Sequence, residues 1–323
     1  MKRAFLWILG LIAIALIGLF AWGYAPDTDP VAMRAKYTNA ASRFVEVEPG
    51  LKVHVRVEGN PAAPALLLLH GSNSSLQTWE PWVARLGKDY RIISMDLTGH
   101  GLTGPHPKRD YRVETTVGVV DAVMTKLGIS RFALAGNSMG GWVSWNYALA
   151  HPDKLTALIL VDAAGAPDSE PTAIPIGFRL ARAPVMRPIL KVFTPRSIIA
   201  KSLDQTMSVK APLTEAAIDR YWELVRYPGN RQATGDRGDV KRSPATPGQM
   251  QRLTMPTLVM WGAEDKLIPV RAADWFAREI PGAQKVIYPK VGHIPMEEVP
   301  DQSAAAVRAF LQATCTPTPT SSC

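Results

Sequence analysis

The sequence predicts an α/β fold built around a largely parallel sheet. Unbroken apolar runs such as residues 155–161 are typical of strands that are buried on both faces. These runs alternate with helical patterns such as residues 113–127, and this alternation favours helices that connect parallel strands. The chain has 323 residues and an apolar fraction of 47%, which suits one large core with an insertion.

The first feature in chain order is an apolar segment. Lys2 and Arg3 precede residues 4–25, which carry no charge and are long enough, at about 1.5 Å per residue, to cross a hydrocarbon core of about 30 Å. A cleaved signal usually has a shorter apolar core, and Pro26 disfavours a cut just before it, although a cut after Gly23 stays open. We therefore expect an uncleaved single-pass anchor. The two cations predict a cytoplasmic N-terminus and a periplasmic or other extracytoplasmic domain.

A loop with unusual residues follows the first clear strand. Residues 26–41 are expected to be a linker, and residues 65–69 then form a continuous apolar strand that ends in His70, Gly71 and Ser72. Such a loop would present the backbone N–H of Ser72 to the oxyanion that forms when a nucleophile attacks a carbonyl. His70 and Gly71 would shape the loop without transferring protons. Taken alone, the segment also fits a simple turn between a strand and a helix.

Residues 136–140, Gly-Asn-Ser-Met-Gly, are the most informative motif. They lie between the apolar run 131–135 and the helix-like run 141–150. A strand, a G-x-S-x-G turn and a helix in this order are typical of a nucleophile elbow, whose strained turn exposes the serine hydroxyl. Ser138 is therefore the candidate nucleophile, and the N–H of Met139 is the second candidate oxyanion donor. A bare G-x-S-x-G also occurs in flexible turns, so the partners of Ser138 decide.

The first partner required is a carboxylate that orients a histidine. The strand-like run 257–261 leads into a loop that contains Glu264 and Asp265. Asp265 is the better candidate acid, with Glu264 and Asp162 as fallbacks. In isolation, Asp265 would fit the cap of a helix that begins near Pro269 equally well.

The second partner is a histidine that takes the serine proton. His293 lies in a loop after the strand-like run 285–288 and is the only histidine after His151. In isolation it would be an ordinary loop histidine. However, Ser138, Asp265 and His293 each follow a predicted strand, and in parallel sheets ligands bind at that end of the strands. The order Ser, Asp, His therefore predicts a catalytic triad.

With these motifs in order, residues 42–312 resemble the α/β-hydrolase superfamily, in its serine-nucleophile branch of esterases and lipases. The matching segments are His70-Gly-Ser72, Asp96-Leu-Thr-Gly-His-Gly101, Gly136-Asn-Ser-Met-Gly140, Trp261-Gly-Ala-Glu-Asp265 and Gly292-His293. The resemblance implies an eight-stranded, mostly parallel sheet with helices on both faces and a helical cap after the sixth strand. It assigns the nucleophile to Ser138, the acid to Asp265, the base to His293 and the oxyanion hole to Ser72 and Met139, with no cofactor. It gives Asp96 a structural role.

The expected domain boundaries follow from where the strand pattern stops. Residues 42–165 and 246–312 form the core, residues 166–245 form the cap, and residues 313–323 form a disordered tail rich in Pro, Thr and Ser. The tail holds both cysteines, Cys315 and Cys323. Without a C-x-x-C or a His/Cys cluster, the sequence gives no support for a metal site.

The expected cap contains a basic stretch. Six cations and no acid lie between Arg179 and Lys201. They form either a solvated face or a contact with anionic lipid headgroups, which would suit an anchored enzyme that takes substrate from the membrane. The net charge of +8 would permit nucleic-acid binding, but no such module is present and export makes it a poor fit. We expect membrane contact and no nucleic-acid partner.

The function expected from these features is hydrolysis of a small-molecule or lipid ester through an acyl-enzyme on Ser138. One alternative is a carbon-carbon bond hydrolase of the same fold. Those enzymes commonly carry a tryptophan after the catalytic histidine, where this chain has Ile294. The other alternative is a membrane-tethered binding protein without activity. The sequence leaves the acyl chain, the alcohol and the oligomeric state open.

Overall fold

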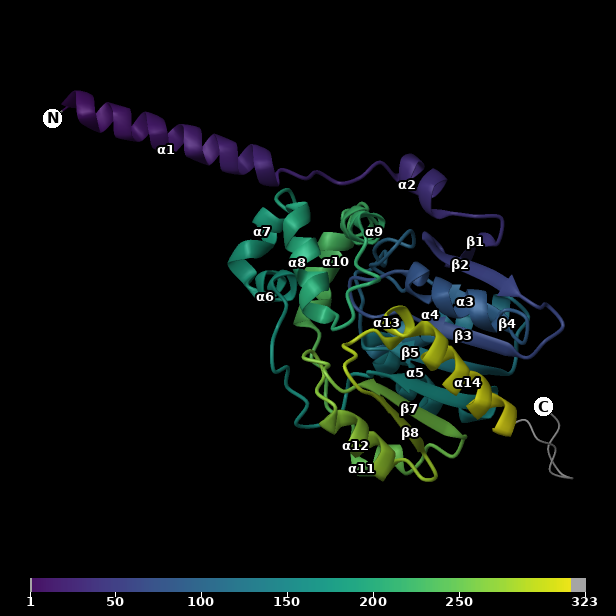
Figure 1. Cartoon of the computed structure of the whole chain (residues 1–323). Helices are drawn as coiled ribbons and strands as arrows, with labels where there is room; N and C mark the ends of the chain where they lie inside the picture. Colours follow the sequence, from purple (N-terminus) through teal and green to yellow (C-terminus); the bar gives the residue numbers. More distant parts are fainter. Residues whose placement is uncertain (1, 315–323) are drawn as a thin grey trace, which may run out of the picture.

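The computed structural model describes residues 2–314, so Cys315 and Cys323 and most of the predicted tail lie outside the described residues. A single eight-stranded sheet has the strand order β1-β2-β4-β3-β5-β6-β7-β8 (Figure 1). Its strands are β1 (Ser42–Glu48), β2 (Leu51–Gly59), β3 (Ala65–Leu69), β4 (Arg91–Met95), β5 (Phe132–Asn137), β6 (Leu155–Val161), β7 (Thr257–Gly262) and β8 (Gln284–Tyr288). Strand β2 runs antiparallel to β1 and β4, and the other pairs are parallel. The predicted α/β fold is thereby confirmed.

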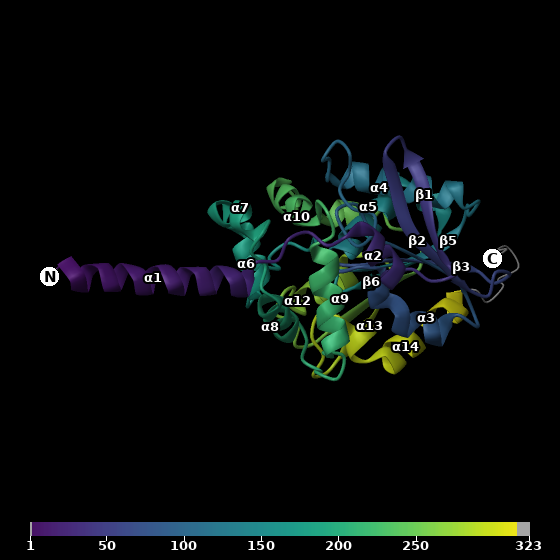
Figure 2. The ribbon, with the colours of Figure 1, turned by 90° about the horizontal axis from the view of Figure 1, so that it is seen from above.

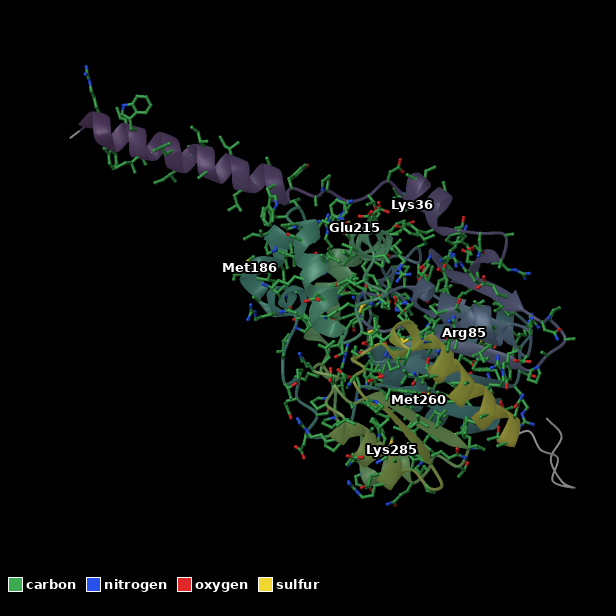
Figure 3. All side chains as sticks on the ribbon, in the orientation of Figure 1. Lys36, Arg85, Met186, Glu215, Met260 and Lys285 are labelled. Atoms are coloured by element: carbon green, nitrogen blue, oxygen red, sulfur yellow. The ribbon has the colours of Figure 1, made fainter. Side chains whose placement is uncertain are left out.

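The central strands end at the same edge of the sheet. Leu69 of β3 is paired with Gly136 of β5, and Asn137 of β5 is paired with Val161 of β6. Strands β3, β5, β6 and β7 are buried over nearly their whole length, which is why their sequences are continuous apolar runs. Met260 of β7 lies in the middle of this layer (Figure 3). The loops after these strands therefore meet at one edge.

Helices cover both faces of the sheet. One face carries α4 (Val113–Lys126), α5 (Met139–Ala150) and α12 (Arg271–Glu279), and the other carries α3 (Glu80–Leu86) and α14 (Pro300–Thr314) (Figure 2). Each face has its own apolar core: one includes Val120, Trp142 and Phe276, and the other includes Trp82 and Phe310. Three short helices, η1 (Leu76–Trp79), η2 (Pro152–Lys154) and α13 (Pro295–Glu298), complete these layers.

Between β6 and β7 the described chain consists mainly of helices joined by loops, and the helices of residues 176–239 lie together at one end of the sheet (Figure 1). We call this segment the cap. Its helices are α6 (Ile176–Arg182), η3 (Pro184–Met186), α7 (Arg187–Leu190), α8 (Arg196–Thr206), α9 (Glu215–Val225) and α10 (Asn230–Asp239), and α11 (Pro247–Met250) leads back to the core.

Helix α1 (Lys2–Gly23) stands out from the domain (Figures 1 and 2). The stretch Phe5–Gly23 has a mean hydropathy of 2.5, and its described side chains as far as Trp22 are exposed. Its apolar side chains project away from the helix without covering the core (Figure 3). By length and composition α1 is able to cross a membrane, as the sequence predicts.

The structure differs from the expectation of a linker over residues 26–41. This segment contains helix α2 (Pro30–Tyr37), which buries Met33 and Tyr37. Asp29 begins the helix because its carboxylate accepts the N–H of Val31 at 2.8 Å. Sequence reasoning overlooked this helix because it is short and its apolar residues are few.

The end of α1 is attached to the cap. Tyr24 and Phe193 form an antiparallel bridge, and the N–H of Ala25 donates to the carbonyl of Val192 at 2.8 Å. The guanidinium of Arg231 donates to the carbonyl of Ala25 and to the carboxylate of Asp27, both at 2.6 Å. Helix α1 therefore continues directly into contacts with the cap.

Candidate active site

Ser138 occupies a strained turn between β5 and α5. Its φ of 54° and ψ of −115° lie outside the regions that non-glycine residues normally adopt. A Cβ at Gly136 would lie 2.3 Å from the carbonyl oxygen of Gly140, and a Cβ at Gly140 would lie 2.1 Å from that of Leu69. Only glycine fits these two positions, which is the physical reason for the G-x-S-x-G pattern. The side chain of Ser138 is half-buried.

Asp265 and His293 are brought together from two loops. The Nδ1 atom of His293 lies 2.7 Å from Oδ2 of Asp265, and both side chains are buried. The other oxygen of Asp265 accepts the N–H groups of Leu267 and Ile268 at 2.8 and 3.0 Å. Glu264, the neighbouring fallback, is exposed. The carboxylate held against His293 is therefore that of Asp265.

Hydrogen bonds connect the turn at Ser138 to residues 289–294, which carry His293 and which we call the histidine loop. The side-chain amide of Asn137, the residue before Ser138, donates to the backbone carbonyl of His293 at 3.0 Å and to that of Val161 at 3.2 Å. The N–H of Ser138 also donates to the carbonyl of Val161 at 3.0 Å. These bonds fix the relative position of the two loops that carry Ser138 and His293.

Asp162, the second fallback, lies behind the Asp265–His293 pair. One ligand atom from each of these three residues lies within 4.8 Å of the others, a spacing that metal sites also use. Here the imidazole nitrogen is bonded to Asp265 instead. Burial and the charge of Asp265 raise the pKa of Asp162 well above its usual range. Burial beside a second carboxyl group therefore favours the protonated form of Asp162.

The loop after β3 lies against Ser138. A Cβ at Gly71 would lie 3.1 Å from the Cβ of Ser138 and 2.9 Å from Oδ1 of Asn137, so glycine permits this approach. The hydroxyl of Ser72 lies 3.3 Å from the sulfur of Met139. His70 has both ring nitrogens engaged, with Nδ1 2.7 Å from the carbonyl of Gly71 and Nε2 accepting the N–H of Leu97 at 3.0 Å. His70 therefore shapes this loop.

A second Ser–His–Asp arrangement exists away from the elbow. Nδ1 of His54 lies 2.7 Å from Asp96, and its Nε2 lies 3.1 Å from the hydroxyl of Ser42. Both His54 and Asp96 are fully buried. The Asp96 carboxylate also accepts the N–H groups of Leu76 and Leu102 at 2.8 and 2.9 Å, which holds the two loops on either side. Ser42 begins strand β1 and has no positive φ, so this group lacks the strained serine turn that Ser138 occupies.

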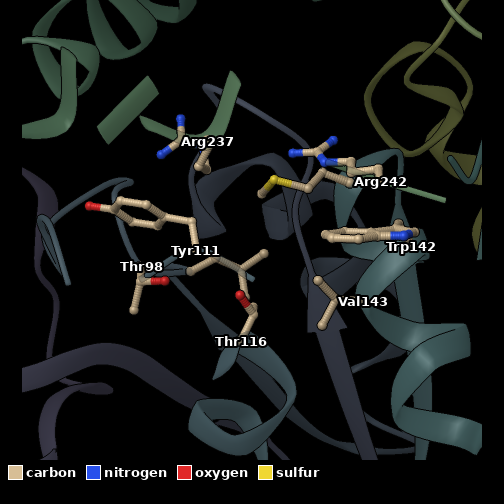
Figure 4. Close-up of a pocket in the computed structure, with 9 residues that line it drawn as sticks. Thr98, Tyr111, Thr116, Trp142, Val143, Arg237 and Arg242 are labelled. Atoms are coloured by element: carbon tan, nitrogen blue, oxygen red, sulfur yellow. The ribbon is translucent and has the colours of Figure 1, made fainter. Parts of the chain in front are cut away.

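A small pocket adjoins the elbow between α4, α5 and the end of the cap (Figure 4). Its walls combine cationic, aromatic, hydroxyl and apolar groups: Leu97, Thr98, Tyr111, Thr116, Met139, Trp142, Val143, Arg237 and Arg242. The Arg242 guanidinium lies 4.7 Å from the centre of the Trp142 ring. Burial lowers the pKa of Arg237 to about 9. Sequence patterns gave no indication of this pocket, because its arginines lie in a polar stretch without periodicity.

A sheet of this topology with a strained serine turn and a paired His and Asp at its edge defines a hydrolase of the α/β fold. The model of the alpha/beta hydrolase fold family matches residues 64–300, and the chain belongs to this family. The predicted superfamily is thereby confirmed.

Three similar proteins illustrate the range of the family. The 2-hydroxy-6-oxononadienedioate/2-hydroxy-6-oxononatrienedioate hydrolase of Cupriavidus pinatubonensis is 28% identical over 78% of this chain and 89% of its own. A membrane phospholipase A described as a bacterial virulence factor has a TM-score of 0.75 at 25% identity, covering 98% of this chain and 100% of its own. An esterase from Rhodococcus has a TM-score of 0.70 at 25% identity, covering 85% and 99%.

Proposed function

We propose that the protein is a membrane-anchored serine hydrolase that cleaves carboxylic esters. The observation that carries the proposal is the 2.7 Å contact between His293 and Asp265 beside the strained turn of Ser138. A serine becomes a nucleophile only when a histidine takes its proton and a carboxylate orients that histidine. The contacts of these three residues fit the roles of nucleophile, base and acid.

In the proposed reaction, Ser138 attacks the ester carbonyl while Nε2 of His293 takes the hydroxyl proton. Asp265 stabilises the imidazolium through Nδ1. His293 then gives the proton to the leaving alcohol, and an acyl-enzyme remains on Ser138. Water attacks the acyl group while His293 takes one of its protons and returns it to Ser138. The acid is released and the enzyme is regenerated.

The backbone N–H groups of Ser72 and Met139 are the proposed oxyanion donors. In the part of the chain that the structure describes, neither N–H donates a hydrogen bond. Both residues lie beside Ser138, and their side chains touch each other at 3.3 Å. Two free donors next to a nucleophile are what a tetrahedral oxyanion requires.

We further propose that the substrate includes membrane lipid esters, with the N-terminus cytoplasmic and the domain on the far side of the membrane. Helix α1 is exposed and apolar, and its end is bonded to the cap. The cap segment next to it exposes Val185, Ile189 and Val192. The similarity to a membrane phospholipase A over 98% of this chain supports a lipid substrate.

Five of the six cations in the basic stretch divide into two groups, and the side chain of the sixth, Arg182, lies outside the described part of the structure. Arg187 pairs with Asp239 at 2.7 Å, and Arg196 pairs with Glu215 and Asp219 at 2.7 and 2.6 Å. The exposed residues Arg179, Lys191 and Lys201 make no ion pair within the described residues. We propose that these three cations meet anionic headgroups.

The proposed chemistry is tested by labelling and turnover. Ser138→Ala and His293→Ala are each expected to abolish hydrolysis of p-nitrophenyl esters, and the double variant to be scarcely worse, because triad members act as a unit. A fluorophosphonate probe is expected to label the wild-type chain and Ser42→Ala equally, and not to label Ser138→Ala. Retained activity in Ser138→Ala would contradict the mechanism.

Carbon-carbon bond hydrolysis is the second candidate. The 28% identity to the Cupriavidus hydrolase favours it, whereas Ile294 after the candidate base favours an esterase. Turnover of aryl and lipid esters, compared with turnover of a vinylogous diketone, distinguishes ester hydrolysis from carbon-carbon bond hydrolysis. Turnover of the diketone alone would establish the second candidate.

A further inference from the structure

Glu298 is a buried carboxylate at the end of α13, shortly after His293 in the chain. Its exposed fraction is 5%, and it makes no salt bridge within the residues that the structure describes. A buried charge without a cation is stable only when hydrogen-bond donors surround it. The N–H groups that donate to Glu298 therefore identify the segments that this carboxylate connects.

Two of its donors flank His293. Oε2 of Glu298 accepts the N–H of Gly292 at 2.9 Å, and Oε1 accepts the N–H of Ile294 at 3.2 Å. The N–H of His293 itself donates to the carbonyl of Thr206 in the cap at 3.1 Å. Three consecutive N–H groups of the histidine loop are thus held from outside the loop.

Its other two donors belong to the cap. Oε2 of Glu298 also accepts the N–H groups of Ser208 and Val209, both at 2.8 Å, just after the end of α8. The cap loop of residues 206–209 and the histidine loop lie so close that a Cβ at Gly292 would lie 2.6 Å from the carbonyl oxygen of Thr206. One carboxylate therefore joins the cap loop to the histidine loop.

The neighbouring Glu297 is equally buried but holds different elements. Its carboxylate accepts the hydroxyl of Thr78 and that of Tyr221, the latter at 2.9 Å, and lies 3.2 Å from the guanidinium of Arg220. In the described residues the Glu297 carboxylate makes no hydrogen bond to the histidine loop. Glu297 is therefore a matched control for Glu298.

We infer that Glu298 is a positioning residue for His293, and that it makes the orientation of the imidazole depend on cap residues 206–209. The inference rests on the proposed function, in which His293 is the general base. Proton transfer from Ser138 needs the base within hydrogen-bond reach. Asp265 contacts only Nδ1 of the imidazole. The direction of Nε2 therefore also depends on the backbone of residues 292–294, to which Glu298 is bonded.

The test compares Glu298→Gln with Glu297→Gln on p-nitrophenyl butyrate. Glutamine offers one acceptor oxygen, and its NH₂ group would face N–H donors. Because a displacement of about 1 Å costs roughly 100-fold in rate, Glu298→Gln is expected to lower kcat by roughly 10- to 100-fold with KM within about threefold. Glu297→Gln is expected to keep kcat within about threefold, since the side-chain bonds of Glu297 bypass the histidine loop.

A second pair of variants leaves Glu298 in place. Ser208→Pro removes one of the cap N–H donors, and the preceding Met207 has φ −98° and ψ 143°, a conformation that suits the residue before a proline. Ser208→Ala keeps the donor. We expect Ser208→Pro to lower kcat several-fold and Ser208→Ala to match the wild-type chain.

Circular dichroism and melting temperature give the folded fraction of every variant, to which kcat is normalised. Normalised kcat at the wild-type level in Glu298→Gln or in Ser208→Pro would overturn the inference, as would equal losses in Glu297→Gln and Glu298→Gln. The wild-type chain and Ser138→Ala are measured alongside. An inactive wild-type chain would contradict the proposed function, whereas an active one with unaffected Glu298→Gln removes only the role of Glu298.

Discussion

At the residue scale, the acid assignment is the sharpest prediction. Asp265→Asn is expected to lower kcat by about 10⁴, by analogy with the aspartate of serine proteases, because the amide favours the wrong tautomer of the histidine. Glu264→Gln is the control, since Glu264 is exposed, and it should keep nearly full activity. Turnover of a short p-nitrophenyl ester measures both. If Asp265→Asn were active and Glu264→Gln inactive, the catalytic acid would be Glu264 and not Asp265.

Asp162 gives a prediction on pH and stability. Burial and the charge of Asp265 raise the pKa of Asp162 in the folded chain well above its value of about 3.8 in the unfolded chain. Above that lower value the folded state holds one more proton than the unfolded state, so this residue makes stability fall as the pH rises until the folded pKa is passed.

Asp162→Asn removes this proton linkage. We expect the melting temperature of the variant minus that of the wild-type chain to increase as the pH rises from 5 to 8. Differential scanning fluorimetry at stepped pH values measures this difference. Asparagine tolerates the φ of 44° at this position. A difference that stays constant over this range would contradict a protonated Asp162.

At the scale of elements, the junction between α1 and the cap carries measurable stability. A chain that begins at Gly23 retains the bonds of Ala25, Asp27 and Thr28 to the cap, and a chain that begins at Pro30 loses them. Four of these hydrogen bonds contribute about 1 kcal/mol each, and a domain of this size loses about 2–4 °C per kcal/mol, so a fall of about 8–16 °C is expected for the shorter chain. Equal melting temperatures would show that the junction contributes nothing.

Helix α2 shows why local sequence patterns did not predict the contacts of the segment after α1. It has only Met33 and Tyr37 buried, and Lys36 and Tyr37 lie 2.7 and 2.6 Å from the carboxylate of Glu223 in α9. The carbonyl of Tyr37 also accepts hydrogen bonds from the side chains of Arg56 and Gln77. A partner so far along the chain leaves no periodic signal in the helix itself. The long helix α1 was predictable because its apolar run is longer than any core element needs.

At the scale of the whole molecule, the apolar helix α1 and the cations of the cap predict a salt-sensitive membrane contact. A chain that begins at Gly23 is expected to bind liposomes with anionic lipids, and replacement of Arg179, Lys191 and Lys201 with glutamine is expected to weaken this binding. Each cation near such a surface contributes about 1 kcal/mol, and salt screens it. Co-sedimentation at low and high salt measures the effect.

The matched control replaces Arg187 and Arg196, whose charges already meet Asp239, Asp219 and Glu215. This control should bind anionic liposomes as the parent chain does. Turnover of a short soluble ester is expected to be unchanged in both sets. Equal partitioning onto anionic and neutral liposomes would show that Arg179, Lys191 and Lys201 are merely solvated. Helix α1 would then be the proposed membrane contact.

The sequence by itself determined the fold class, the family and the presence of an apolar N-terminal helix. These follow from short-range patterns: continuous apolar strands, the glycines that a strained turn demands at positions 136 and 140, and an uncharged segment of membrane length. The candidate roles of Ser138, Asp265 and His293 rest on the same kind of signal, because each follows a strand.

Only the tertiary structure decided which groups share an environment. The pKa of Asp162 is raised because two carboxyl groups that follow different strands are buried together. Glu298 joins the cap to the histidine loop because it accepts hydrogen bonds from donors on both. The attachment of α1 to the cap and the pairing of Arg187 and Arg196 are likewise contacts between distant segments. Burial and electrostatic coupling depend on distances in space, and a linear sequence carries no direct record of those distances.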